Sequence, residues 1–190
     1  ESSAASDVYK RQVTDPQFVG VLGRIGEDEL ALTGADAVRS HLIYAMSTKV
    51  PVLVVTATGR EAEDLTAEVK SMIGDRVAMF PSWETLPHEK LSPAVDTVAQ
   101  RRKALYDVRR GKVDVLIAAV RSLVQPIVDD LEAEASAPIH VQLDRDCENL
   151  VERLVHHGYS HVDMVGRRGQ FAVRGGIVDV FPATEELPVR

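Results

Sequence analysis

The amino-acid sequence predicts an α/β protein built on a parallel sheet, followed by a smaller α+β domain. Three observations predict this class. Of the 190 residues, 45% are hydrophobic and 27% are charged, which is typical of a globular chain. Short β-branched runs alternate with longer amphipathic segments, as they do in βαβ units. Near residue 131 this alternation stops, and short strands then follow one another without long helices between them.

The elements of the first domain begin at residue 18. Apolar residues at helical spacing predict helices at 18–25 and 37–45, with a short strand at 30–32 between them. Residues 51–56, Pro-Val-Leu-Val-Val-Thr, are apolar on both faces, as expected of a parallel strand that is buried on both sides. Right-handed crossovers would then place helices on both faces of the sheet.

The rest of the first domain continues the same alternation. We predict a helix, a strand, a long connection, a second helix and the most hydrophobic strand of the chain, at residues 60–73, 76–80, 81–93, 94–110 and 113–120. Gly74 is the expected end of the first of these helices. The connection contains prolines along its length and so is no single regular element. We expect its Trp83 to anchor it in the core, and the alternative is a surface for a partner.

A smaller α+β domain is predicted over residues 131–190. Its elements are a strand, a helix ended by Gly158 and three short strands, at residues 139–143, 148–157, 161–165, 170–174 and 177–181. Close spacing and glycine turns indicate that these last strands pair in antiparallel fashion. Residues 1–12 show no hydrophobic periodicity and are interpreted as a disordered tail or an artefact of cloning or sequencing.

Composition excludes several classes of protein. The 22 Lys and Arg residues against 29 Asp and Glu give a net charge of −7, which does not favour attraction of the whole molecule to nucleic acid or anionic lipid. No apolar run approaches the ~20 residues of a membrane span. Cys147 is the single cysteine, and with no secretory signal we expect a reducing cytoplasm. The scattered histidines predict no metal site.

The turn after residues 30–32 has the position of a phosphate-binding loop without its chemistry. A working loop needs glycines for close backbone approach, a lysine for the β- and γ-phosphates and a hydroxyl for Mg²⁺. Here Gly34 is present, but the Asp36 carboxylate would lie next to a bound phosphate and repel it. Ala37 and Val38 offer neither charge nor hydroxyl. The sequence therefore predicts a degenerate Walker A loop, a turn capped by Asp36 that binds no nucleotide.

One cluster of basic residues is a candidate protein-binding surface. Between residues 164 and 177 there is no acidic residue, and this stretch holds Arg167, Arg168 and Arg174. Arg174 lies on the opposite strand face from Phe171, beside a Gly-Gly turn, which suits bidentate recognition of a carboxylate at an interface. The alternative is a solvated surface.

A second basic cluster is a candidate for direct DNA binding, although the net charge disfavours it. It lies on the predicted helix 94–110, where a solvated outward face is expected. Its members are Arg101, Arg102, Lys103, Arg109 and Arg110.

Two series of motifs resemble a known family. The first is Trp83-Glu84-Thr85-Leu86-Pro87, followed by Leu91-Ser92-Pro93, Asp96 and Arg101. The second is Gly-Tyr-Ser-His-Val-Asp at 158–163, Gly-Gln-Phe-Ala-Val-Arg-Gly at 169–175, Asp-Val-Phe-Pro at 179–182 and Glu-Leu-Pro at 186–188. From about residue 18 to 190 the chain resembles the amino-terminal part of the bacterial transcription-repair coupling factors (Mfd). The excision-repair helicase subunit UvrB is a more distant relative, which differs in having an intact P-loop.

The resemblance implies an adaptor and not an enzyme. This family displaces RNA polymerase stalled at DNA damage and recruits the nucleotide-excision-repair protein UvrA, through the second domain of a UvrB-like module that has lost its ATPase motif. On this resemblance, residues 18–130 are a UvrB-like domain 1A, an inactive P-loop-helicase-like scaffold. Residues 131–190 are a UvrA-binding domain 2 that is truncated at its C-terminus. No cofactor is expected here, because ATP, Mg²⁺, DNA and RNA polymerase would be bound by other domains of a parent that is an ATP-dependent DNA translocase.

The resemblance also assigns site residues. The family's UvrA-contacting arginines map onto Arg174 and Arg190, and the predicted surface is completed by Phe171, Arg167 and Arg168. The implied mechanism is competitive mimicry, in which this surface offers UvrA the same arginine-bearing hairpin as UvrB. The alternatives from other classes are a nucleotide-dependent DNA helicase fragment of the UvrB type and a direct DNA-binding module.

Overall fold

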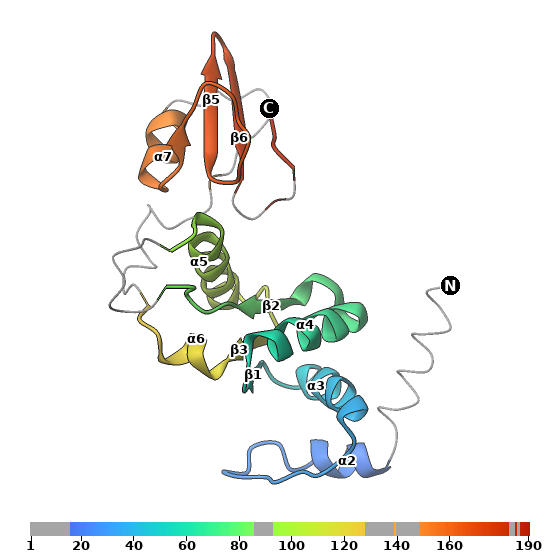
Figure 1. Cartoon of the computed structure of the whole chain (residues 1–190). Coiled ribbons are helices and arrows are strands. Elements are labelled where there is room, and N and C mark those ends of the chain that lie inside the picture. Colours follow the sequence, from blue (N-terminus) through green and yellow to red (C-terminus); the bar gives the residue numbers. More distant parts are fainter. Residues whose placement is uncertain (1–15, 86–92, 128–138, 140–148, 183–184, 186) are drawn as a thin grey trace. The chain divides into compact units, whose positions relative to one another are not determined.

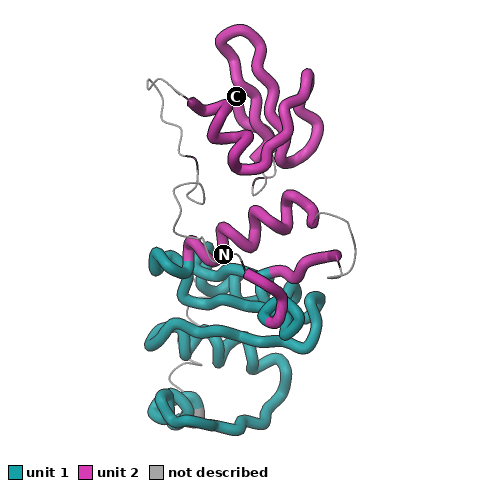
Figure 2. Tube along the Cα trace, turned by 90° about the vertical axis from the view of Figure 1, so that its left-hand side faces the viewer, with its two compact units in different colours: residues 1–80, 108–123 teal, residues 81–107, 124–190 magenta. Residues whose placement is uncertain are grey.

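The chain forms two compact units. The computed structural model describes residues 16–85, 93–127, 139, 149–182, 185 and 187–190 (Figure 1). Unit 1 comprises Glu1–Phe80 and Val108–Leu123, and unit 2 comprises Pro81–Asp107 and Val124–Arg190 (Figure 2). Unit 2 thus includes residues 81–107, which the predicted division assigns to the first domain. The predicted tail and the predicted boundary between residues 130 and 131 lie outside the described residues, so that division stays a prediction.

Unit 1 contains a parallel sheet and its flanking helices. Its elements are α2 (Pro16–Leu22), η1 (Asp36–Val38), α3 (Arg39–Ser47), β1 (Val52–Thr56), α4 (Gly59–Ile73), η2 (Gly74–Arg76), β2 (Val77–Phe80), β3 (Val115–Ala119) and the start of α6 (Val120–Val124). The strands lie in the order β1-β3-β2, and both pairs are parallel, with Val115 opposite Val52 and Val77. The prediction of an α/β fold with a parallel sheet is confirmed. The short helix α6 was not predicted.

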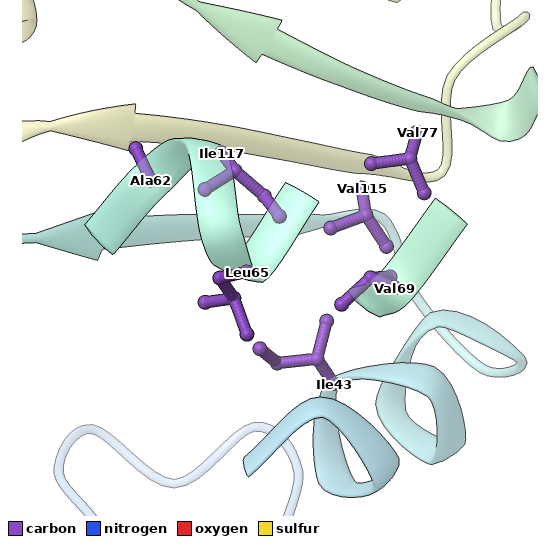
Figure 3. Packing of buried hydrophobic residues seen from close by; sticks show 7 residues of the cluster. All are labelled: Ile43, Ala62, Leu65, Val69, Val77, Val115 and Ile117. Carbon is purple, nitrogen blue, oxygen red and sulfur yellow. The ribbon is translucent and has the colours of Figure 1, made fainter. Parts of the chain in front are cut away.

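The core of unit 1 is formed by the sheet with helices α3 and α4 (Figure 3). Residues one helical turn apart on α4 supply one side of it, and Leu65 and Val69 are 1% and 0% exposed. Alternate residues of β3 supply the other side, and Val115 and Ile117 are fully buried. The whole cluster comprises Ile43, Ala62, Leu65, Val69, Val77, Val115 and Ile117. Burial of this apolar surface is the main stabilising contribution to unit 1.

The prediction that residues 51–56 are buried on both faces is wrong. On β1, Val52 and Val54 pack against the core cluster, whereas Leu53 and Val55 alternate with them and are 55% and 49% exposed. The reason is the place of β1 in the sheet. Among the described strands it pairs with β3 alone, so it is an edge strand.

The prediction of a strand at residues 30–32 is also wrong. Residues 27–35 form neither helix nor strand, and Leu32 is 48% exposed. A strand is held extended by hydrogen bonds to a neighbour, and no described strand lies beside this run. The other elements predicted for the first domain are confirmed within a few residues, and Gly74, with a φ of 66°, ends α4 as expected.

Unit 2 contains a second, smaller sheet. Its elements are α5 (Val95–Arg109, of which residues 95–107 belong to unit 2), α7 (Leu150–His156), β4 (Ser160–His161), β5 (Gln170–Arg174) and β6 (Ile177–Phe181). The strand order is β4-β5-β6. The antiparallel pairing of β5 with β6 and the helix ended by Gly158 are confirmed. The predicted strand at 139–143 lies outside the described residues apart from Ile139.

The predicted antiparallel pairing of the first two strands is wrong, because β4 pairs with β5 in parallel. Ser160 lies opposite Gln170 and His161 opposite Phe171. Residues 162–169 therefore return the chain to the end of the sheet at which β4 begins. Such a short parallel connection is unusual, since crossovers normally take about a dozen residues or more, often as a helix.

A buried arginine holds the start of unit 2. Arg101 on α5 is 3% exposed, and its Nη1 and Nη2 groups donate to the carbonyls of Pro81 and Pro126 at 2.6 and 3.4 Å. Its guanidinium lies 4.3 Å from the centre of the Trp83 ring. Burial lowers the pKa of Arg101. The prediction that Arg101 faces outward is therefore wrong, and the candidate DNA-binding cluster loses this member.

Trp83 holds the chain after β2 by hydrogen bonds at a half-buried position, and not in the core as predicted. Its backbone N–H donates to Oε1 of Gln125 at 2.7 Å, and its indole Nε1–H donates to the carbonyl of Pro126 at 3.3 Å. These bonds join two stretches that are far apart in sequence. Most of the predicted connection, residues 86–92, lies outside the described residues.

Candidate functional site

The sheet of unit 2 has two distinct faces. Residues directly opposite each other in an antiparallel pair point to the same face. One face carries Phe171, Val173, Val178 and Val180. The other, which we call the arginine face, carries Gln170, Ala172, Arg174, Ile177, Asp179 and Phe181. The predicted placement of Phe171 and Arg174 on opposite faces is thus confirmed.

Phe171 is part of the core of this sheet. Its side chain is 0% exposed, and its ring centroid lies 5.1 Å from that of His161. A side chain without exposed surface cannot contact a partner directly. The predicted partner surface is therefore corrected to exclude Phe171, which holds β5 in place from the other face.

Arg174 is exposed on the arginine face, with its guanidinium held by the backbone. Its Nε and Nη2 groups donate to the carbonyl of Asp163 at 3.1 and 2.5 Å. This carbonyl belongs to the connection between β4 and β5. The contact occupies one edge of the guanidinium and leaves the Nη1 side for other acceptors. An arginine held in this way has lost part of its rotamer freedom before any partner arrives.

Arg190 reaches the same face through a short β-bridge. Val189 and Val180 exchange backbone hydrogen bonds of 2.7 and 2.9 Å, which places residue 190 beside Asp179. Nε and Nη2 of Arg190 donate to the two carboxylate oxygens of Asp179 at 2.6 and 3.1 Å. This bidentate pair lowers the pKa of Asp179, and the positive charge of Arg174 lowers it further. The structure therefore brings the two predicted arginines together around one carboxylate.

Arg168 contacts the Phe181 end of the sheet, and its sequence neighbour Arg167 is exposed. Nε of Arg168 donates to the carbonyl of Glu185 at 2.8 Å, and its guanidinium lies 5.9 Å from the Phe181 ring centroid. Its Nη1 group is 3.5 Å from the carboxylate of Asp96. Arg167 has an exposed side chain, and the hydrogen bond found for it is made by its backbone N–H. Arg174 and Arg190 are therefore the centre of the candidate site, and Arg167 and Arg168 stay predicted members of its surface.

The Asp179–Arg190 pair makes a testable contribution to pH dependence. Because the pKa of Asp179 is lowered in the folded chain, its contribution to stability is present above its ordinary value of 3.8 and is lost as the pH falls through the folded value. Arg190→Ala is expected to raise this pKa toward the ordinary value, since the hydrogen-bonded guanidinium is its largest cause. A carboxyl ¹³C NMR titration of Asp179 measures the shift. An unchanged pKa in the variant would contradict the pairing.

The predicted phosphate loop does not form a strand-loop-helix unit. Gly34 lies in the irregular segment, and residues 36–38 form η1, which carries Asp36, Ala37 and Val38 at exposed positions. The residue that precedes η1 is Ala35, and no side chain caps the turn. The predicted cap by Asp36 is therefore wrong, because Asp36 is already the first residue of the turn.

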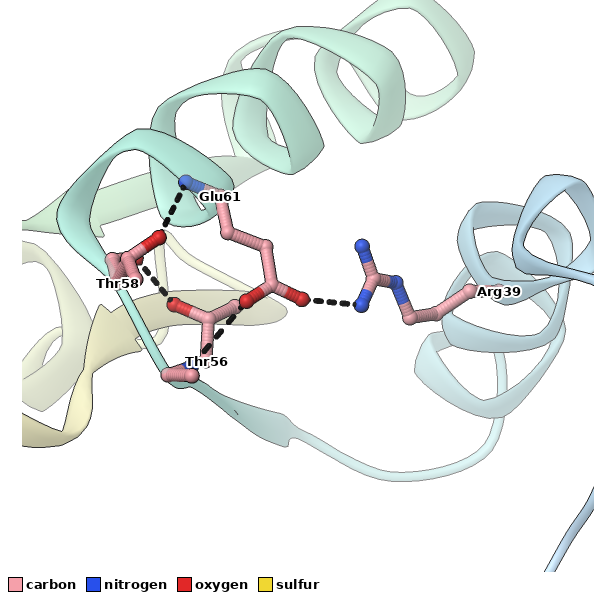
Figure 4. A network of polar contacts seen from close by, with 5 residues as sticks. Arg39, Thr56, Thr58 and Glu61 are labelled. Carbon is pink, nitrogen blue, oxygen red and sulfur yellow. Dashed lines mark hydrogen bonds and ion pairs between the residues drawn. The ribbon is translucent and has the colours of Figure 1, made fainter.

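The start of α4 is closed by the chain's own side chains (Figure 4). Thr58 caps the helix, with its hydroxyl accepting from the backbone N–H of Glu61 at 3.2 Å. The Glu61 carboxylate accepts from the backbone N–H of Ala57 at 3.3 Å and pairs with Arg39 of α3 at 2.5 Å. The bond from Arg39 lowers the pKa of Glu61. The Glu61 carboxylate thus occupies the position at the start of α4 where a helix N-terminus would otherwise attract an anion.

The described part of the chain contains neither a cluster of metal ligands nor a membrane-spanning helix. Among these residues, no group of three or more His, Cys, Asp and Glu side chains is arranged to hold a metal ion. None of the helices described here combines the length and apolar character needed to cross a membrane.

Comparison with known proteins places the arginine face in a named domain. A family model described as the UvrB interaction domain matches residues 138–190. The transcription-repair-coupling factor of Mycobacterium bovis is 47% identical over 184 residues, which are 92% of this chain and 15% of that protein. The chain is a homologue of one segment of the transcription-repair-coupling factors. Those of Bacillus subtilis and Escherichia coli are 32% and 31% identical, over 77% and 88% of this chain.

The family resemblance inferred from the motifs is thereby confirmed. The chain spans 15% of the length of the Mycobacterium coupling factors and 13% of that of Bacillus subtilis. The matched domain contains all of β4, β5 and β6 together with every residue of the predicted partner surface.

Two residues of the site were not predicted from the sequence. Asp179 is one, although the Gly-Gly turn at 175–176 indicates a hairpin from which its position could have been inferred. A hairpin centred on that turn places Asp179 on the face of Arg174. Gln170 is the other, and no sequence pattern indicates that its side chain organises the loop before β5.

Proposed function

We propose that this segment is an adaptor that recruits UvrA to RNA polymerase stalled at DNA lesions, in transcription-coupled nucleotide excision repair. The observation that carries the proposal is the meeting of Arg174 and Arg190 around Asp179 on one face of the sheet, within the stretch matched by the UvrB interaction domain. The names of the relatives, transcription-repair-coupling factors, support the repair context.

The chemistry of the face fits a partner with carboxylates on its surface. Guanidinium groups donate in a planar fork that matches a carboxylate, and here two of them are held by acceptors of the chain itself. Charged pairs at such an interface mainly set specificity and the rate of association. UvrA would then meet the same kind of arginine-bearing hairpin that it meets in UvrB, so that the two proteins compete for it.

We also infer that unit 1 is a helicase-like scaffold without ATPase activity, so that the segment is no enzyme and holds no cofactor. Asp36 in η1 and Glu61 at the start of α4 support this, because each places a carboxylate where a nucleotide phosphate would be repelled. Binding of ATP, Mg²⁺, DNA and RNA polymerase is assigned to other parts of a longer parent, an ATP-dependent DNA translocase.

A binding titration of this chain against purified UvrA tests the adaptor proposal. Saturable binding is expected, and it should weaken as salt is raised from low to physiological concentration, because the contact is between charged groups. Calorimetry with ATP and Mg²⁺ is the matched control, in which no heat of binding is expected. A folded chain that fails to bind UvrA contradicts the proposal, and micromolar binding of ATP would favour the helicase alternative.

A further inference from the structure

We propose that Gln170 is a positioning residue that fixes the direction of the Arg174 guanidinium through the loop 162–169. This inference rests on the proposed function, because it concerns how the same arginine face is made ready for UvrA. Gln170 does not itself contact the partner in this proposal. It acts through the backbone of the loop.

The side chain of Gln170 holds the middle of the loop. Its Oε1 atom accepts the backbone N–H groups of Gly166 and Arg167 at 3.0 and 2.9 Å. Both partners are donors, so the amide oxygen and not the amide nitrogen must face them. One half-buried side chain therefore satisfies two consecutive N–H groups of a segment that has no strand or helix.

The two ends of the loop are held by the sheet. The N–H groups of Ser160 and Val162 donate to the carbonyls of Gly169 and Phe171, both at 2.9 Å. Gly169, with a φ of 77°, donates to the carbonyl of Phe181 at 2.9 Å. Between these ends, the side-chain contacts that the structure gives for the loop backbone come from the arginine face, namely those of Gln170 and Arg174.

Arg174 and Gln170 are therefore coupled through the same short loop. The carbonyl of Asp163, which holds Arg174, is separated from the bonded N–H of Gly166 by two residues. Without the Gln170 oxygen, Gly166 and Arg167 would exchange their bonds with water, and the Asp163 carbonyl would lose its fixed direction. The guanidinium would then have to be immobilised when the partner binds, which lowers affinity.

Two variants and a control test the first step, which is loop organisation. Gln170→Leu removes the acceptor at nearly constant size, and amide hydrogen exchange at Gly166 and Arg167 is expected to accelerate about tenfold or more. Gln170→Glu retains an acceptor oxygen and is expected to restore protection. Gln100→Leu, at an exposed position on α5, is the matched control and should leave exchange at both amides unchanged. Unchanged protection in Gln170→Leu would overturn the proposal.

The second step is partner binding. Gln170→Leu is expected to weaken UvrA binding by about three- to tenfold, and Gln170→Glu to recover most of that loss. In an Arg174→Ala background the same Gln170→Leu change should not weaken UvrA binding further, because Gln170 affects binding only through the Arg174 guanidinium. A purely structural role would give the same loss in both backgrounds, and that result would overturn the proposal even if the single variant were less stable.

The outcomes separate this inference from the proposed function. If the unmodified chain does not bind UvrA, the adaptor proposal fails and the positioning role fails with it. If the unmodified chain binds and Gln170→Leu binds equally well with its loop amides released, the positioning role alone is overturned.

Discussion

Arg174→Ala is expected to weaken binding to UvrA by about tenfold or more, the largest effect of any single change on the arginine face. The guanidinium is exposed, held in direction by the Asp163 carbonyl, and next to the Asp179–Arg190 pair. Removing one partner of a hydrogen-bonded charge pair that an interface buries typically costs about 2–5 kcal/mol, part of which is the unpaired charge left on the other side. Titration calorimetry at low and at physiological salt measures the loss.

Two further variants make this result interpretable. Arg174→Lys keeps the charge but loses the planar fork, so an intermediate loss of affinity is expected. Arg153→Ala removes an exposed arginine of α7 and should leave binding unchanged. The fold should survive in Arg174→Ala, since Gln170 still holds the loop, and circular dichroism checks this. Affinity equal to that of the unmodified chain would remove Arg174 from the interface.

Arg101→Met is expected to destabilise unit 2 by about 3 kcal/mol. Methionine fills most of the space but leaves the carbonyls of Pro81 and Pro126 without their charged donor, and hydrogen bonds to charged groups are worth about 1.5–3 kcal/mol. The contact with the Trp83 ring is lost as well, which adds about 0.5–2 kcal/mol. Removal of a buried charge offsets part of this loss.

The single tryptophan of the chain reports on this change directly. Urea unfolding followed by Trp83 fluorescence gives the free energy of unfolding at the position where the contact is lost. Arg121→Met, at an exposed position on α6, is the control and should stay within about 0.5 kcal/mol of the unmodified chain. A similarly small change in Arg101→Met would show that the buried arginine is not needed for stability.

The parallel sheet of unit 1 could be predicted because its signal is local. Apolar residues of α4 recur at helical spacing, and Leu65 and Val69 are buried where that spacing places them. Position in the sheet is not a local property. Hydrophobic composition alone could not show that β1 is an edge strand with Leu53 exposed, or that the run at 30–32 would have no strand beside it.

The errors in unit 2 have a different physical origin. Strand direction in β4 depends on the loop 162–169, which is held by backbone hydrogen bonds to the sheet and by contacts with the side chains of Gln170 and Arg174. The burial of Arg101 depends on carbonyls of Pro81 and Pro126, which come from either side of α5 in the sequence. Neither contact leaves a periodic pattern in the sequence.

The candidate site was predicted in its residue types more than in its geometry. Arg174 and Arg190 meet around Asp179, whereas the assignment of Arg167, Arg168, Arg174 and Arg190 to one partner surface stays a prediction. Their arrangement depends on the hairpin register and on the bridge between Val180 and Val189, which bring Asp179 between two arginines. These are contacts between segments, so they follow from the folded sheet.

The absence of regular structure before η1 limits what a single substitution there could do for phosphate binding. A lysine introduced at position 37 would stand on a 3-10 turn after an irregular segment, with the Asp36 carboxylate beside it. The start of α4 is already closed by Glu61 and Arg39. Ala37→Lys alone would therefore create no triphosphate-binding loop, because backbone and charge would both have to change at once.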